Sequence, residues 1–136
     1  MFVSRLYRGG KIMISNFEID FIKYKPSLIK SIGRGGSMFV TSLQLLLNNQ
    51  SIGKQHDGKK WVCNTAVQWA KYLGYSTRQI DRIVSSLREK QIIFVKKLSH
   101  FKGNLTNYYT INYAKLWEII PELRSFFIPP HSGKSS

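Results

Sequence analysis

The residues best placed to do chemistry lie between residues 76 and 90, where polar side chains recur at helical spacing. At about 100° per residue, the face opposite the apolar side chains of this segment holds Arg78, Arg82, Ser85 and Glu89, with Gln79 and Ser86 on one flank. Arginine can pair with the edge of guanine through two hydrogen bonds or can bind phosphate, and short hydroxyl side chains allow close approach. Thr77 and the free backbone amides near the start of the helix can hold a phosphate. The alternative interpretation is an ordinary solvated helix face that carries two arginines.

A second basic segment follows this helix. Residues 92–95 begin a strand that becomes basic at residues 96–97, and a turn-rich stretch at 99–107 leads to a second strand at 108–113. The pattern predicts a β-hairpin with a basic tip. Such a hairpin can lie along a nucleic-acid backbone or enter the minor groove. Its expected phosphate contacts are Lys96, Lys97, His100, Lys102 and Asn104.

Two short amphipathic helices with clear end signals position the arginines. Asn64 or Thr65 supplies the N-cap of the first helix, and Gly74 ends it because glycine tolerates the left-handed conformation. Ser76 and Gln79 form a capping box that begins the second helix. The inward stripe of that helix is Ile80, Ile83, Val84 and Leu87. So tight a connection predicts a helix–turn–helix over residues 64–90.

The chain before residue 64 gives weaker signals. Alternating apolar residues at 17–22 predict a short strand or extended arm. Pro26 is expected to open a short helix over residues 27–32 that Gly33 ends, followed by a flexible basic turn at 34–36. Ser37 is expected to cap a helix that reaches about Asn49. A polar, turn-forming stretch and a short strand at 61–63 complete this part.

Charge is the most informative bulk property. The chain has 136 residues, with 21 Lys and Arg against 7 Asp and Glu, for a formal net charge of +14. Such an excess repels itself in the folded state, so we expect a polyanionic partner. Nucleic acid is the first candidate and an anionic membrane is the rival. No apolar run approaches the ~20 residues of a membrane-spanning helix, and the N-terminus has no signal-peptide pattern. We therefore expect a cytoplasmic protein without a membrane partner.

Several kinds of chemistry are not expected. Cys63 is the only cysteine, which excludes an intrachain disulfide and disfavours a thiolate zinc site, and we expect an inert core thiol. The acidic residues are scattered, and even the closest pair, Glu18 and Asp20, does not suggest a two-metal site. His100 has no ligand-spaced partner. We expect no enzyme, no catalytic or metal-binding residue, no cofactor and no small-molecule substrate.

The order of these elements resembles the winged-helix superfamily, and more narrowly the winged-helix domains of plasmid and phage replication or regulatory proteins. Five motifs carry the resemblance: Tyr-x-Pro-Ser-Leu at 24–28, Asp-Gly-x-x-Trp at 57–61, Thr-Ala…Trp-Ala…Leu-Gly-x-Ser-x-Arg-Gln at 65–79, Leu-x-x-Lys-x-Ile-Ile at 87–93, and Tyr-Tyr-x-Ile-Asn-Tyr at 108–113. It implies an α+β winged helix–turn–helix fold, mostly helical with a small antiparallel sheet. It also implies double-stranded DNA binding through a recognition helix at about 76–90 and a basic wing at about 94–110. The implied role is replication initiation or transcriptional regulation of a mobile element.

The expected organisation has three parts. Residues 1–15 form a flexible basic segment, residues 16–120 the winged helix–turn–helix domain, and residues 121–136 a partly disordered C-terminal extension. Trp117 is expected in the core, whereas Phe126 and Phe127 are expected to pack on a second subunit if the protein is a homodimer. Winged-helix proteins that read palindromic sites usually need such a dimer. The alternative function is a winged-helix protein–protein adaptor that does not bind DNA.

Overall fold

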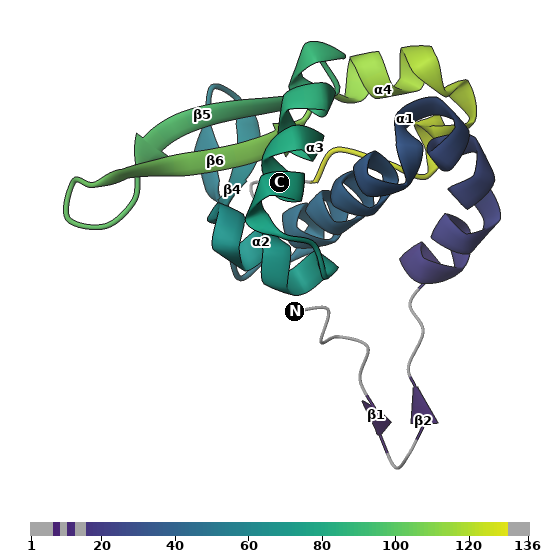
Figure 1. The fold of residues 1–136 in the computed structure, drawn as a ribbon, viewed down its shortest axis with the longest axis horizontal. Coiled ribbons are helices and arrows are strands. Elements are labelled where there is room, and N and C mark those ends of the chain that lie inside the picture. Colours follow the sequence, from purple (N-terminus) through teal and green to yellow (C-terminus); the bar gives the residue numbers. More distant parts are fainter. Residues whose placement is uncertain (1–6, 9–10, 13–15, 131–136) are drawn as a thin grey trace.

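The computed structural model describes residues 7–8, 11–12 and 16–130, and the side chains of residues 26–130. This part of the chain has the expected α+β composition, with four α-helices and a small four-stranded antiparallel sheet (Figure 1). The elements are β1 (Tyr7–Arg8), β2 (Lys11–Ile12), α1 (Asn16–Asn48), β3 (Lys54–His56), β4 (Lys59–Cys63), α2 (Ala66–Leu73), α3 (Thr77–Glu89), β5 (Ile93–Ser99), β6 (Leu105–Ile111), α4 (Tyr113–Ile119) and the 3-10 helix η2 (Pro121–Ser125). Among the helices of these ranges, none combines the length and apolar character that crossing a membrane requires.

The sheet has the strand order β3–β4–β6–β5, with antiparallel neighbours throughout. β5 and β6 form the hairpin predicted at residues 92–113 and pair along their whole length. β4 joins β6 through the pairs Val62–Tyr109 and Cys63–Tyr108. Because side chains alternate along a strand, Val62 and Tyr109 share one face of the sheet and Cys63 and Tyr108 share the other.

Three aromatic side chains join α1, α2 and the sheet in the centre of the core. The rings of Phe39 on α1 and Trp69 on α2 have centroids 4.2 Å apart, and both residues are fully buried. The Tyr109 ring lies 5.9 Å from Phe39 and 5.6 Å from Trp69, edge-on to both. Edge-to-face packing of this kind is favourable beyond the burial of area. The face of the sheet that carries Tyr109 is therefore the one that the helices cover.

The strand or extended arm predicted at residues 17–22 is wrong, because α1 begins at Asn16 and runs through this segment. The apolar residues that alternate there also include Phe17 and Phe21, which are four residues apart. Six residues are too few to separate a repeat of two from a repeat of 3.6. The longer helix that follows settles the choice.

A kink at Gly33 interrupts α1. This glycine has φ 80° and ψ 166°, which lie outside the helical region and which only glycine adopts readily. A helix thus breaks at Gly33 as predicted, although it passes through Pro26 instead of beginning there. The flexible basic turn expected at residues 34–36 is wrong, since these residues resume the helix.

The glycines after the kink let α3 pack closely against α1. A Cβ atom at Gly35 would lie 2.8 Å from Cδ1 of Ile83 on α3, much closer than carbon atoms normally approach. Ser37, expected to cap a helix, lies instead inside α1, and its side chain is only 1% exposed. This stretch of α1 is therefore a packing surface for α3, and its glycines are required by that contact.

The C-terminal segment belongs to the same core. Phe127 is fully buried and Phe126 is 8% exposed, so the expectation that they pack on a second subunit is wrong. η2 turns the chain back toward α1, and Trp117 Nε1 donates a hydrogen bond of 2.9 Å to the Phe127 carbonyl. Trp117 packs against the core as predicted. Residues 131–136 of the expected extension, and most of the expected basic segment 1–15, lie outside the described residues.

Candidate nucleic-acid interface

Both helices of the predicted helix–turn–helix have capped ends. Thr65, not Asn64, is the N-cap of α2: its Oγ1 accepts from the Gln68 amide at 3.0 Å, and Gln68 Oε1 accepts from the Thr65 amide at 2.8 Å. Gly74 takes the predicted left-handed conformation, with φ 76°, and ends α2. The chain then turns sharply into α3, so the relative placement of α2 and α3 is set by residues close together in sequence.

The predicted capping box of α3 is confirmed. Ser76 Oγ accepts from the Gln79 amide at 3.1 Å, and Gln79 Oε1 accepts from the Ser76 amide at 2.9 Å. Gln79 therefore uses its side-chain oxygen within the helix and presents only its amide nitrogen outward. The N-terminal turn of α3 is fixed, which holds the exposed side chains that follow it in a defined direction.

The exposed face of α3 carries the arginines that the sequence singles out. Ile80 and Leu87 are each 1% exposed and anchor the opposite face against the core. The predicted contact residues Thr77, Arg78, Gln79, Arg82 and Ser85 are all exposed, and Ser86 is half-buried. Within residues 26–130, neither arginine of this set takes part in an ion pair. Ser86 Oγ accepts a hydrogen bond of 3.0 Å from Lys90 Nζ, so it belongs to the flank of this face.

The β5–β6 hairpin projects well beyond the rest of the molecule (Figure 1). Lys97 Nζ donates to Asn107 Oδ1 at 3.3 Å across the two strands. Lys97 lies two residues after Val95, which packs against the core, so alternation places it on the helix-covered side of the sheet. Residues 91–112 contain no Asp or Glu. The hairpin therefore carries lysines and no acidic residue, and Lys97 lies on the same side of the sheet as the helices.

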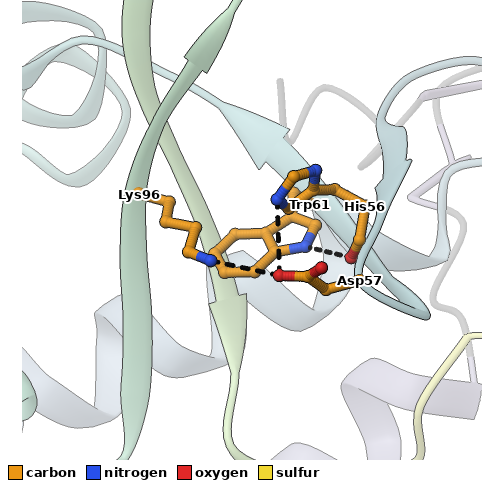
Figure 2. Close-up of polar contacts among 4 residues, drawn as sticks. All are labelled: His56, Asp57, Trp61 and Lys96. Atoms are coloured by element: carbon orange, nitrogen blue, oxygen red, sulfur yellow. Dashed lines mark hydrogen bonds and ion pairs between the residues drawn. The ribbon is translucent and has the colours of Figure 1, made fainter.

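Lys96 lies on the other face and has a partner within the chain. Its Nζ is 3.1 Å from Asp57 Oδ2, and Asp57 is also 3.4 Å from His56 Nε2 (Figure 2). The hydrogen bond from Lys96, followed by the charges of His56 and Lys96, lowers the pKa of Asp57. Trp61 lies beneath this group and donates from Nε1 to the His56 carbonyl at 2.9 Å. The ion pair between Lys96 and Asp57 thus links β5 to the β3–β4 turn, a role that the sequence position of Lys96 did not suggest.

His100 lies where the hairpin tip begins and contacts two neighbouring strands. Its Nδ1 is 3.1 Å from the Tyr108 hydroxyl and 3.7 Å from Cys63 Sγ. Burial, and secondarily Cys63, raise the pKa of Tyr108. Cys63 is half-exposed, so the buried core thiol expected from its neighbours is wrong. Alternation places Cys63 on the face of the sheet opposite Val62, where its neighbours are His100 and Tyr108 instead of the helices.

Strand β3 is a part of the site that sequence reasoning missed. Lys54 Nζ donates a 2.6 Å hydrogen bond to the Ser99 carbonyl at the end of β5, so β3 is linked to the hairpin close to its tip. Its three residues are all polar, which gave no apolar alternation to identify a strand. Among the described residues, no group of three or more His, Cys, Asp or Glu side chains is arranged to hold a metal ion.

The two predicted sets lie on consecutive elements: α3 carries the exposed side chains, and the acid-free β5–β6 hairpin directly follows it. Of the predicted hairpin residues, Lys97, Lys102 and Asn104 are exposed, His100 is exposed but bonded to Tyr108, and Lys96 is paired with Asp57. Comparison with known proteins adds no relative: no family model matches the chain, and searches of curated proteins and of solved structures find no match.

Proposed function

We propose that this chain is a winged helix–turn–helix protein that binds double-stranded DNA, with α3 as the recognition helix and the β5–β6 hairpin as the wing. One observation supports the proposal: two exposed arginines, Arg78 and Arg82, lie on the helix that directly precedes a projecting hairpin with no acidic residue. Arginines that stabilise a fold are usually paired with carboxylates, whereas these two have no ion-pair partner among the described residues. They are free to contact an external anion.

The shape of α3 suits the major groove. That groove is about 12 Å wide and admits an α-helix. The capping box and the buried Ile80 and Leu87 fix α3 to the body, while Arg78, Arg82 and Ser85 point outward. In this pose the arginines read base edges or bind phosphates, and the serine permits close approach of the helix.

The wing supplies contacts that do not depend on sequence. Lys97 and Lys102 are exposed, and the wing lies directly after α3 in the chain, so phosphates beside the recognition site are within its reach. The sequence resemblance to plasmid and phage proteins extends the proposal to replication initiation or transcriptional regulation of a mobile element. That extension depends on the resemblance alone.

Selection of random duplexes on the purified protein at two salt concentrations tests the proposal. We expect enrichment of one sequence and a steep loss of affinity with salt. A palindromic site would show that two copies bind together, through surfaces other than Phe126 and Phe127. If no sequence is enriched and the protein is not retained on a DNA column, the adaptor function replaces this proposal.

Variants of the contact residues sharpen the test. On the selected duplex, R78A/R82A should cost roughly 1–3 kcal/mol per lost base contact and flatten sequence preference. K97A should weaken all duplexes alike and reduce the salt slope by about 1. K30A/K115A removes two positive charges from α1 and α4 and serves as the matched control. If R78A/R82A binds the selected duplex as tightly as the control variant does, the assignment of α3 is wrong.

A further inference from the structure

The tip of the β5–β6 hairpin exposes two large apolar side chains. Phe101 and Leu105 are each 63% exposed, more than any other large hydrophobic residue whose side chain is described. Phe101 lies in the turn between β5 and β6 and Leu105 is the first residue of β6; this turn is at the far end of the hairpin, away from the helices (Figure 1). Water-exposed apolar groups of this size are unfavourable, and a hairpin tip is normally polar. We therefore expect these two side chains to contact a binding partner.

The tip holds these side chains in a defined turn. The His100 amide donates to the Asn104 carbonyl at 2.7 Å, and the Asn104 amide donates to the Phe101 carbonyl at 3.0 Å. Lys102 and Gly103 take left-handed conformations, with φ 51° and φ 81°. Phe101 is thus presented on a hydrogen-bonded turn, which reduces the entropy lost when a partner binds it.

Positive charge lies beside the apolar tip. Lys102 Nζ is 5.5 Å from the centroid of the Phe101 ring, and Lys97 lies further back on the same hairpin. No Asp or Glu occurs between residues 91 and 112. A partner that suits an apolar tip flanked by lysines and by no carboxylate must offer an apolar surface between anionic walls. Duplex DNA offers this arrangement, because phosphates line the edges of the minor groove and the apolar faces of two stacked bases become accessible where a step opens toward that groove.

We infer that Phe101, supported by Leu105, is a wedge that enters the minor groove and partly unstacks one base step, so that the bound duplex is kinked. This inference rests on the proposed DNA binding and adds a consequence that the recognition helix alone does not have. Proteins that insert apolar side chains from the minor groove bend the duplex toward the major groove. Flexible pyrimidine–purine steps cost least to deform, so the wedge favours such a step in the site.

The test uses the full-length protein and the duplex recovered by selection. Donor and acceptor dyes on the two ends report bending, and 2-aminopurine placed in turn at each step reports unstacking. Wild-type protein should shorten the end-to-end distance and raise 2-aminopurine fluorescence at one step. F101A/L105A should still bind, with an affinity about tenfold lower, but should leave the duplex straight and stacked. F101W should retain the kink, and I128A, which removes an apolar side chain 51% exposed on the C-terminal segment, should behave as wild type.

The outcomes separate this inference from the proposal on which it rests. If wild-type protein and F101A/L105A both bind the duplex and bend it equally, or neither bends it, the wedge is refuted and binding by α3 stands. If the wild-type protein binds no duplex, the wedge and the proposed DNA binding are both refuted. Binding of the same proteins to vesicles of phosphatidylserine and phosphatidylcholine is measured as the last comparison. Loss of vesicle binding in F101A/L105A, with duplex bending intact, would assign the tip to a membrane surface instead. Both side chains are exposed, so equal urea midpoints should confirm that the variants fold.

Discussion

Replacing Gly35 with alanine should destabilise the protein through the contact between α1 and α3. The new Cβ would lie 2.8 Å from Cδ1 and 3.0 Å from Cγ1 of Ile83. Favourable carbon contacts need about 3.5–4.0 Å, so Ile83 or α3 must move by roughly 1 Å. Overpacking of this kind costs about 1–3 kcal/mol, while alanine gains at most about 1 kcal/mol of helix propensity over glycine. The cost of the clash exceeds the gain in helix propensity, so the free energy of unfolding should fall by an amount on the order of 1 kcal/mol.

A double-mutant cycle isolates the contact. In the wild-type background, I83V deletes Cδ1 and should cost about 0.5–1.5 kcal/mol. In the G35A background the same deletion relieves the closest approach, so it should cost almost nothing. The coupling free energy between the two sites should therefore be about 1 kcal/mol. G36A is the matched control, because the nearest side-chain atom to its Cβ would be Leu87 Cδ2, at a milder 3.3 Å.

Urea denaturation followed by circular dichroism measures each free energy of unfolding. Independent sites add within about 0.3–0.5 kcal/mol. If G35A and I83V are additive within that margin, or if G35A stabilises the protein as a surface helix position would, then α3 does not pack on the glycine face of α1.

Three further predictions concern single residues. S76A should lower the free energy of unfolding by about 1 kcal/mol, because the Gln79 amide loses its side-chain acceptor; an effect no larger than that of T77A would contradict the cap. F127A should cost about 3–5 kcal/mol at every protein concentration, because Phe127 is buried in its own chain; a loss that varies with concentration would indicate a dimer contact. K96M should raise the pKa of Asp57 toward its ordinary value, as followed by NMR of the carboxyl carbon. Because this pKa is lowered in the folded state, the stabilisation by the pair is present above about pH 3.9 and is lost as the pH falls through the lowered pKa; an unchanged titration in K96M would refute the pair.

The sequence by itself determined the elements whose signals are local. The Ser76–Gln79 box, the glycine end of α2 and the apolar stripe of α3 each involve residues within one or two helical turns, and all are present in the structure. The β5–β6 hairpin was also predictable from local sequence, because two runs rich in β-branched and aromatic residues lie on either side of a polar, turn-rich segment. The exposure of Arg78 and Arg82 follows directly from the stripe, so the main candidate surface was predictable.

Only the tertiary structure decided the features that depend on residues distant in sequence. The sequence of residues 34–36 indicates a turn, but in the structure these residues are helical and α3 packs closely against the two glycines. Phe126 and Phe127 suggest a subunit interface in sequence, but the C-terminal segment folds back on its own chain and buries them. Lys96 and Lys97 look equivalent in sequence, yet Lys96 pairs with Asp57 while Lys97 lies on the opposite face. Each outcome depends on which surfaces meet once the chain is compact. Periodicity shows which face of an element is apolar, but it does not show what that face packs against.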